Sequence, residues 1–322
     1  MRSRFVRIRA SRGEPGNAAT PLIAGPAAAT AAVDHSGDPA KLSCMSNVRL
    51  RRLERVSTFR RLALAAWGAP SDPTIHGSLE IDATAALAHL AALRGQGDVK
   101  ATLTHLVGRA LAKVLAEHPE LNVLIRWGRF YQRDDVDIFF QVALQADAEL
   151  AAVDLSGVVV RNADRKTVLE IAGEFAARVQ QVREDRDPEL AGLRKRLAQI
   201  PPLLLRPVQA ALDFLQYSFN LKMPGLPRDA FGSAMVTNIG MFGMRWAYAP
   251  LFPPSHCPIV VVVGAVHSKP CVVTDGDGEK LAIRPILPLH ASMDHRVLDG
   301  VQAARVASRL EHLLLHPAEL DA

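Results

Sequence analysis

The order in which helical and strand-like patterns follow one another constrains the fold of this chain most. Apolar side chains at helical spacing predict helices over 83–97, 102–121 and 164–185. Strand patterns occur at 74–82, 136–145, 233–240, 257–266, 269–275 and 280–293, ahead of a closing amphipathic helix at 300–316. Because helices and strands do not alternate regularly, the sequence predicts an α+β fold rather than a doubly wound α/β fold.

One stretch, 190–228, departs from this pattern. Its apolar residues keep helical spacing, but the spacing is interrupted by Pro201, Pro202, Pro207, Pro224 and Pro227. We therefore expect a hydrophobic helical hairpin inserted into the domain. Its large apolar side chains either pack into the core or form a lid or acyl-binding surface. They are Leu203, Leu204, Leu205, Leu212, Phe214, Leu215, Tyr217 and Phe219.

Residues 1–44 have the composition of an appendage rather than of a folded domain. The segment is rich in Ala, Pro and Gly and has no periodic apolar face, so it cannot bury enough apolar surface to order itself. We expect a disordered or non-native extension. A targeting segment, a flexible tail and translation upstream of a natural start at Met45 are the three origins considered. The folded domain is then expected over 45–322, with the insertion at about 190–228.

Charge and cysteine content argue against several classes of protein. The net charge is +5, and residues 1–44 carry +3 of it (six Lys/Arg against three Asp/Glu), which leaves +2 for the remainder. This is not the basic surface on which nucleic-acid binding depends, so we expect no nucleic-acid partner. The three cysteines (Cys44, Cys257, Cys271) lack Cys-x-x-Cys spacing, which favours a reducing, cytoplasmic compartment. No uncharged apolar run reaches the roughly 18 residues of a membrane span.

The stretch SMDHRVLDG, 292–300, concentrates groups that can carry chemistry. His295, Asp299 and Gly300 form H-x-x-x-D-G between a predicted strand and the closing helix, where loops commonly present reactive groups. A histidine there can take a proton from a thiol or hydroxyl near neutral pH. The aspartate can hold an arginine and fix the turn, and the glycine can allow a tight turn into the helix. Spacing alone leaves His295 as either a catalytic base or a structural turn residue.

The residues around His295 resemble the C-terminal signature of the dihydrolipoyl acyltransferases of 2-oxo acid dehydrogenase complexes. The D-H-R-x-x-D-G core is the most specific part, and FGSAMVTNIGMFG, 231–243, resembles a strand–turn segment of the same family. Further matches follow in the expected order at 158–172, 269–270 and 283–285. The resemblance extends over about 50–189 and 229–320. It implies a chloramphenicol acetyltransferase-like fold, a two-layer sandwich of a mixed sheet packed with helices, assembled as a homotrimer.

The resemblance also implies a mechanism. His295 would be the general base that deprotonates a thiol of coenzyme A or of a dihydrolipoyl group, and the thiolate would attack an acyl thioester. Thr237 matches the family hydroxyl that hydrogen-bonds the tetrahedral oxyanion, although an ordinary strand threonine is the alternative. In this family the two residues face each other across a subunit boundary. The implied function is acyl transfer between a thioester, either acyl-CoA or acyl-lipoyl, and a thiol acceptor.

Three further positions follow from the resemblance as candidate substrate-binding residues. Arg60 matches a basic position near the start of the family domain and would pair with Asp299 to orient the catalytic turn. Asn238 follows Thr237 and is also interpreted as a side chain that hydrogen-bonds within a turn. Gly300, where the closing helix begins, is the third.

The chain departs from complete family members before its catalytic domain. Residues 1–44 are too few for a lipoyl domain, and neither Lys41 nor Lys100 has the context of a lipoylated lysine. We therefore expect a free-standing form that uses coenzyme A as a substrate. A lipoyl group would be supplied only in trans, by a lipoyl-carrier or dehydrogenase subunit. Two alternatives stay open: a CoA-dependent acyltransferase with an alcohol or amine acceptor, and a catalytically silent trimeric scaffold that binds partners through 190–228.

The other histidines receive structural interpretations. His256 and Cys257 are adjacent, and adjacent side chains on an extended chain point to opposite sides, which argues against a nucleophile pair. His312 and His316 have a spacing that can bind metal on a helix. No third ligand is evident beside them, so we expect no metal site.

Overall fold

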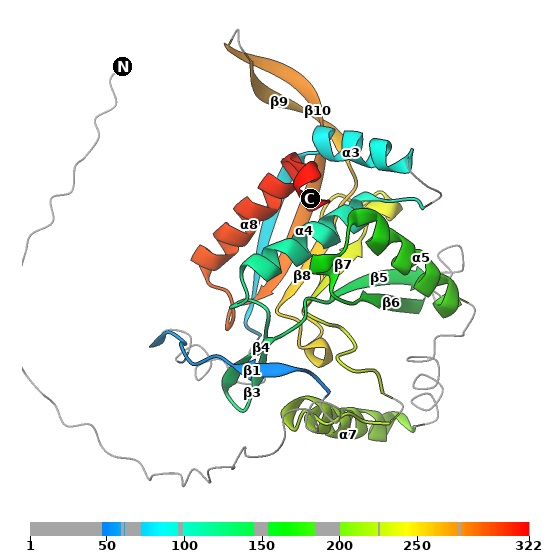
Figure 1. Ribbon diagram of the computed structural model, residues 1–322, viewed down its shortest axis with the longest axis vertical. Helices are drawn as coiled ribbons and strands as arrows, with labels where there is room; N and C mark the ends of the chain where they lie inside the picture. Colours follow the sequence, from blue (N-terminus) through cyan, green and yellow to red (C-terminus); the bar gives the residue numbers. More distant parts are fainter. Residues whose placement is uncertain are drawn as a thin grey trace, which may run out of the picture. The chain divides into compact units, whose positions relative to one another are not determined.

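The computed structural model describes residues 47–58, 61, 72–95, 99–144, 154–183, 200–224, 226–275 and 278–321 (Figure 1). The chain divides into two compact units, Met1–Pro39 and Ala40–Ala322, and every described residue belongs to the second. The extension predicted at 1–44 lies outside the described residues and stays a prediction. Within the described ranges, no helix combines the length and the apolar character needed to cross a bilayer.

A mixed sheet forms the centre of the second unit. Its strands in spatial order are β2 (Thr74–Asp82), β10 (Gly278–Asp294), β8 (Ile259–Val263), β7 (Ala234–Asn238), β5 (Ile138–Leu144) and β6 (Asp154–Val160). The neighbours β5, β7 and β8 run parallel to one another, and the other neighbours are antiparallel. β9 (His267–Asp275) pairs with the first half of β10 in a hairpin that projects from the body (Figure 1). The predicted α+β fold with a mixed sheet is confirmed.

Helices pack on one face of this sheet (Figure 1). They are α3 (Thr84–Arg94), α4 (Leu103–Glu117), α5 (Val168–Arg183) and α8 (Gly300–Leu315). α4 contacts the other three and is buried along most of its length. Gly108 is required on α4, because a Cβ there would lie 2.3 Å from the ring of Phe140 on β5. The main core lies between this helical layer and the sheet, around Ile81, Leu106, Leu111, Phe140, Ile171 and Leu287.

A smaller three-stranded sheet lies beside the main one, in the order β1 (Leu50–Arg52), β4 (Arg129–Arg133) and β3 (Val123–Arg126). Trp127 and Gly128 connect β3 to β4 with positive φ angles of 50° and 67°, the geometry of a tight hairpin turn. Short 3₁₀ helices connect the larger elements: η2 (Ala163–Arg165), η4 (Gly240–Phe242), η5 (Pro253–Ser255) and η6 (Pro317–Leu320).

The described part of the insertion is one helix, α7 (Pro202–Asp213), followed by the π-helical turn η3 (Phe214–Ser218). Pro202 starts the helix, where a missing N–H is tolerated, and Pro207 is accommodated inside it. The predicted helical hairpin is therefore a single helix over the described residues 200–224, while 190–199 lies outside them. Its apolar side chains are divided: Tyr217 is buried, whereas the exposed ones are Leu204, Leu205, Phe214 and Phe219.

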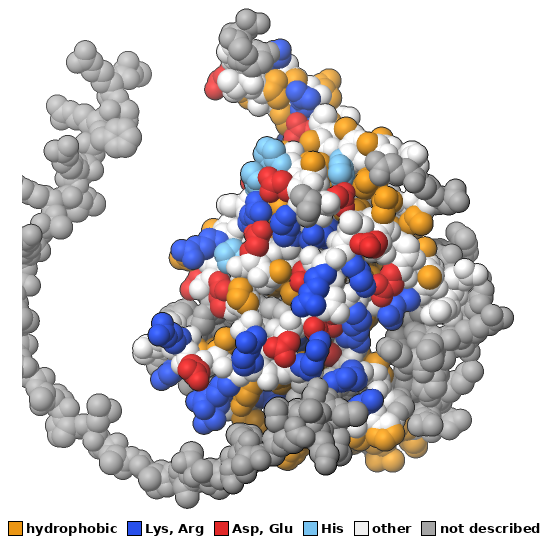
Figure 2. Space-filling view, in the orientation of Figure 1, with side chains coloured by type: hydrophobic (Ala, Val, Ile, Leu, Met, Phe, Trp, Pro, Cys, Tyr) orange, Lys and Arg blue, Asp and Glu red, His pale blue; other side chains and the backbone are white. Residues whose placement is uncertain are grey.

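The exposed side chains of the insertion form an aromatic cluster with the β3–β4 turn. The rings of Trp127, Phe214 and Phe219 meet edge to face, with centroids 5.3–5.6 Å apart. The indole N–H of Trp127 donates to the Ser218 carbonyl oxygen at 2.7 Å, which fixes the turn against η3. Figure 2 shows hydrophobic side chains gathered at the lower edge of the molecule, over α7.

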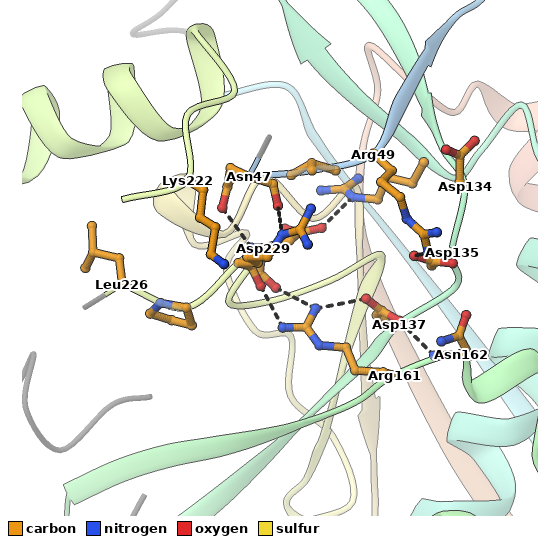
Figure 3. Close-up of a pocket in the computed structure, with 14 residues that line it drawn as sticks. Asn47, Arg49, Asp134, Asp135, Asp137, Arg161, Asn162, Lys222, Leu226 and Asp229 are labelled. Atoms are coloured by element: carbon orange, nitrogen blue, oxygen red, sulfur yellow. Dashed lines mark hydrogen bonds and ion pairs between the residues drawn. The ribbon is translucent and has the colours of Figure 1, made fainter. Parts of the chain in front are cut away.

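A charged cavity of about 600 Å³ lies where the insertion rejoins the body (Figure 3). Arg133 donates to the Asp229 carboxylate at 3.0 Å, and both side chains are buried. Arg161 donates to the Asp137 carboxylate at 2.9 Å and to the Asp229 carbonyl at 3.1 Å. Because breaking a buried ion pair leaves an uncompensated charge, these contacts hold the end of the insertion on the sheet. None of the candidate catalytic residues lines this cavity.

Candidate active site

His295 lies in the turn between β10 and α8, one residue after the strand ends. Its backbone N–H donates to the Pro73 carbonyl at 2.8 Å, which ties the turn to the start of β2. Its ring Nδ1 lies 2.7 Å from the Leu298 carbonyl oxygen. A carbonyl oxygen only accepts, so Nδ1 carries the hydrogen and the lone pair of the neutral ring is on Nε2. The contact with Leu298 therefore fixes the orientation and the tautomer of the neutral His295 ring.

The charged residues on either side of His295 pair with each other. Arg296 donates from Nη2 to one carboxylate oxygen of Asp294 at 2.7 Å and from Nε to the other at 3.0 Å. The backbone N–H of Arg296 also donates to this carboxylate, at 2.9 Å. Asp294 is largely buried at the end of β10, so this bidentate pair fixes the backbone next to His295.

Asp299 caps the N-terminus of α8. Its Oδ1 accepts from the backbone N–H groups of Val301 and Gln302, at 2.9 and 3.1 Å. The Gln302 side chain accepts from the Asp299 N–H at 3.0 Å, which completes a capping box. The predicted partner, Arg60, lies outside the described residues, so that pairing and the substrate-binding role of Arg60 stay predictions. Asp299 thus supports the turn that carries His295 through backbone contacts.

The expectation that Gly300 is needed for a tight turn is wrong for the described structure. Gly300 is the first residue of α8, and its φ does not fall in the left-handed region. A Cβ at this position would meet no atom within 4 Å. The backbone of this chain therefore does not require a glycine here, and a contact with substrate stays a prediction.

Thr237 lies near the end of β7 on the face of the sheet opposite the helices. Val236 belongs to the main core under the helical layer, whereas Met235 belongs to a second apolar cluster, so strand alternation places Thr237 with Met235. Thr237 is half-buried and lines an open cavity of about 690 Å³. A hydroxyl in the wall of an apolar cavity can donate to a developing oxyanion in a water-poor environment.

Asn238 has a structural set of contacts. Its Nδ2 donates to the Thr104 hydroxyl on α4 at 2.7 Å, and its Oδ1 accepts from the Met241 N–H at 3.3 Å. The side chain thus links the end of β7 to the helical layer and to η4. These contacts agree with the turn hydrogen bond expected from the sequence, and its substrate-binding role stays a prediction.

The register of the sheet separates Thr237 from His295 within one chain. Thr237 pairs with Val262 on β8, and Val262 pairs with His290 on β10. His295 lies five residues farther along. With about 3.3 Å per residue and about 4.8 Å per strand, the two Cα atoms are roughly 15–20 Å apart. One chain alone therefore does not bring the candidate base to the candidate oxyanion donor.

A hydrogen-bonded chain that sequence analysis missed lies level with Thr237. His290 is almost fully buried, and its Nε2 donates to the Arg245 carbonyl at 2.8 Å. Its Nδ1 must then accept from the Ser78 hydroxyl at 2.8 Å, and the Ser78 oxygen accepts from the Tyr248 hydroxyl at 2.7 Å. Polar residues at alternating positions of 74–82 were the available signal. These bonds tie the β7–β8 connection to β2 and β10.

The remaining candidates are structural. Cys257 is buried, and burial raises the pKa of its thiol to about 12, so it is not a thiolate nucleophile. His256 pairs with Asp213 at 2.8 Å instead of with Cys257. His312 lies 2.8 Å from the Glu319 carboxylate. Across the ranges that the structure describes, no three His, Cys, Asp or Glu side chains gather as metal ligands.

The mixed sheet, the helices on one face and the D-H-R-x-x-D-G turn are together those of an acyltransferase catalytic domain. The family model of the 2-oxoacid dehydrogenases acyltransferase (catalytic domain) matches residues 51–189 and 229–321. The chain belongs to this family. The two matched ranges leave out the insertion, including α7 and η3.

Curated relatives agree with this assignment. The chain is 27% identical over 273 residues to the dihydrolipoyllysine-residue acetyltransferase component of the pyruvate dehydrogenase complex of Bacillus subtilis (strain 168), covering 82% of this chain and 50% of that relative. It is 25% identical over 311 residues to the mitochondrial dihydrolipoyllysine-residue acetyltransferase component of the pyruvate dehydrogenase complex of Schizosaccharomyces pombe (strain 972 / ATCC 24843). This match covers 95% of this chain and 52% of that relative. The chain thus spans about half the length of these relatives.

Solved structures show the same fold. The probable dihydrolipoamide acetyltransferase of Listeria monocytogenes 4b F2365 superposes with a TM-score of 0.55 at 17% identity, covering 82% of this chain and 94% of that one. The dihydrolipoamide acetyltransferase of Azotobacter vinelandii gives 0.55 at 22% identity, covering 83% and 93%. The expected acyltransferase fold is confirmed.

Proposed function

We propose that this chain transfers an acyl group between a thioester, acyl-CoA or acyl-lipoyl, and a thiol acceptor. The observation that carries the proposal is the 2.7 Å contact between His295 Nδ1 and the Leu298 carbonyl. It leaves the basic lone pair on Nε2, which is the atom that must receive the thiol proton. The membership of the acyltransferase family supports the same reaction.

The proposed steps use two side chains. His295 Nε2 takes the proton of the acceptor thiol, and the thiolate attacks the carbonyl carbon of the thioester. The Thr237 hydroxyl donates to the oxyanion of the tetrahedral intermediate, which lowers its free energy by about 3 kcal/mol. The intermediate then expels the donor thiolate, which recovers the proton from His295. The thioester bond to the donor sulfur breaks as the bond to the acceptor sulfur forms, so no net oxidation occurs. Coenzyme A would take part as a substrate, as donor or acceptor of the acyl group.

The separation of His295 and Thr237 supports a site formed between chains of a homotrimer. A closed ring brings His295 of each chain next to Thr237 of a neighbour, so three interfaces give three sites. Co-expression of His295→Ala with Thr237→Val chains tests this directly. A site with both intact residues forms at about a quarter of the interfaces in random mixed trimers. We expect the mixture to recover that share of activity, while each variant alone stays inactive.

Two results would count against this arrangement. A monodisperse monomer with full activity would show that one chain forms a complete site. Mixed oligomers without recovered activity would place both residues in the same site of one chain, against the register of the sheet.

The reaction itself is tested by thioester exchange. The full chain is mixed with acyl-CoAs and free dihydrolipoamide, and release of coenzyme A is followed. Transfer that His295→Ala abolishes without loss of the assembly supports the proposal. Transfer only to an alcohol or amine would support the alternative of a CoA-dependent acyltransferase with a non-thiol acceptor. Absence of transfer to every acceptor would support the alternative of a catalytically silent scaffold.

A further inference from the structure

We propose that the cavity beside Thr237 binds an uncharged acyl chain of about six to eight carbons, rather than only the two carbons of an acetyl group. The inference rests on the proposed function, because it takes Thr237 as the oxyanion donor. It adds the chemical class of the acyl group, which neither the family nor its relatives determine for this chain.

The floor of the cavity is the face of the sheet opposite the helices. Thr237 and Met235 lie two residues apart on β7 and point to the same side. Phe139 on β5 and Val260 on β8 pair with Met235 from either side. An acyl carbonyl at the Thr237 hydroxyl would therefore have an apolar floor beside it. The floor extends along β7 towards Met235, whose Cα atom lies about 7 Å from that of Thr237.

The roof comes from the connections before β7 and between β7 and β8. Phe231 packs on Phe139 with ring centroids 5.0 Å apart and on Phe252 at 5.6 Å. Ala249 packs over the same cluster of Phe139 and Met235. The hydrogen bond from Tyr248 to Ser78 holds this connection down at 2.7 Å. The roof is thus fixed by packing and by hydrogen bonds.

A glycine opens room for the floor. A Cβ at Gly157 on β6 would lie 1.9 Å from the Phe139 ring, so any larger residue would displace that ring. The absence of a side chain lets Phe139 lie over β6. The Phe139 ring thus forms part of the cavity floor, and Gly157 lines the same cavity.

Size and polarity decide which acyl group fits. The cavity has about 690 Å³, within the range of pockets that hold drug-sized ligands, and an acetyl group would leave most of it empty. None of its described lining residues carries a charge. A succinyl group would bury its carboxylate without a cation, which is costly. An uncharged alkyl chain can lie against the apolar side chains of the floor and roof without burying a charge.

Chain-length dependence of the reaction tests the inference. The values of kcat/KM are measured for the full chain with acetyl-, butanoyl-, hexanoyl-, octanoyl- and succinyl-CoA, with dihydrolipoamide as acceptor. Each buried methylene contributes a factor of about four, so we expect a steep rise from acetyl to hexanoyl. Succinyl-CoA should be a poorer donor than butanoyl-CoA. A preference for acetyl or succinyl over hexanoyl and octanoyl overturns the inference and leaves the proposed function intact.

Substitutions locate the acyl chain. Ala249→Phe fills space between roof and floor, and we expect it to lower hexanoyl transfer at least tenfold more than acetyl transfer. The matched control is Ala211→Phe, the same change at an exposed position of α7, which should alter neither. Equal loss for every donor in an assembled Ala249→Phe protein would mean that the cavity is not the acyl site.

A second variant covers a failure of Ala249→Phe to assemble. Met235→Ala enlarges the floor, and it should shift the preferred chain length upward by one or two carbons. An unchanged preference in assembled Met235→Ala overturns the inference, because a residue that limits the chain must affect its length. If the wild type uses no acyl-CoA at all, the proposed function is wrong. That outcome differs from an unexpected chain-length preference in either variant, which would overturn only the inference about the cavity.

Discussion

Thr237 lies level with His290, not with His295, across the central sheet. Val262 of β8 pairs with both Thr237 and His290, and His295 follows five residues later, beyond the end of β10. His290 cannot substitute as the base, because its two ring nitrogens are engaged by the Arg245 carbonyl and the Ser78 hydroxyl. In the proposed mechanism each chain would therefore carry two half-sites, one at Thr237 and one at His295, and the reaction would need two copies of the chain.

His295→Ala should abolish acyl transfer while the protein keeps its fold. Removal of a general base lowers kcat by about 10²–10⁴-fold. The change is measured as kcat with saturating acyl-CoA, together with the mass of the assembly by light scattering. Arg305→Ala, an exposed change on α8, serves as the control. If His295→Ala turns over at the wild-type rate, His295 is a turn residue and not a base.

Thr237 is tested by a pair of substitutions that differ in the hydroxyl. Thr237→Val keeps the shape but removes the donor, and kcat should fall by about 10²–10³-fold. Thr237→Ser keeps the donor and should retain most of the activity. Similar kcat values for the Val and Ser variants would exclude an oxyanion contact by this hydroxyl.

Asp299→Ala should destabilise the protein by about 1 kcal/mol, because two backbone N–H groups of α8 lose their acceptor. The midpoint of thermal unfolding should fall by about 2–4 °C in a domain of this size. Asp299→Ser restores a capping oxygen and should recover most of this loss. The cap is unimportant if the Ala and Ser variants unfold at the same temperature.

Stability should fall below pH 6.5 because of His105. This histidine is buried on α4, and burial lowers the pKa of its ring from 6.5 to about 4. As the pH falls from 6.5 towards 4, the unfolded chain takes up a proton that the folded chain does not, so stability is lost. The loss amounts to roughly 3 kcal/mol at pH 4 and levels off as the pH falls below the folded-state pKa.

His105→Gln provides the comparison for that pH dependence. Glutamine can keep the capping-box acceptor for the Thr102 N–H, which His105 Nδ1 now provides at 3.2 Å, but it does not titrate. Urea unfolding at pH 7.5 and pH 5 measures the difference. The wild type should lose more stability than His105→Gln between these two values. Parallel losses in the two proteins would assign the acid sensitivity to other groups.

The sequence predicted the fold where local patterns determine it. The alternation of 74–82 gave β2, and helical spacing gave α4 and α8, because a period of two or 3.6 is visible within a single element. Sequence analysis failed where position depends on distant parts of the chain. The pairing of Ser78 with His290, 212 residues apart, follows from sheet register, which no local pattern encodes.

The local structure of the candidate site was predicted in part. The place of His295 between a strand and the closing helix was predicted, because this turn is formed by residues next to it in the sequence, including the Leu298 carbonyl that orients its ring. The capping role of Asp299 was missed, although D-x-x-Q before an apolar helix is a recognisable cap signal. The division of the insertion into buried Tyr217 and exposed Phe214 depends on contacts with β1 and β3, which the spacing of apolar residues does not show.

The distance between the two half-sites has a consequence for how activity is controlled. If the proposed base and oxyanion donor act together only across two copies of the chain, a single newly synthesised chain carries no complete site and should be inactive. Total activity would then rise more than linearly with the concentration of the chain, because the assembled fraction also rises, until association is complete. Dilution below the dissociation constant of the assembly would then switch acyl transfer off reversibly, without any inhibitor.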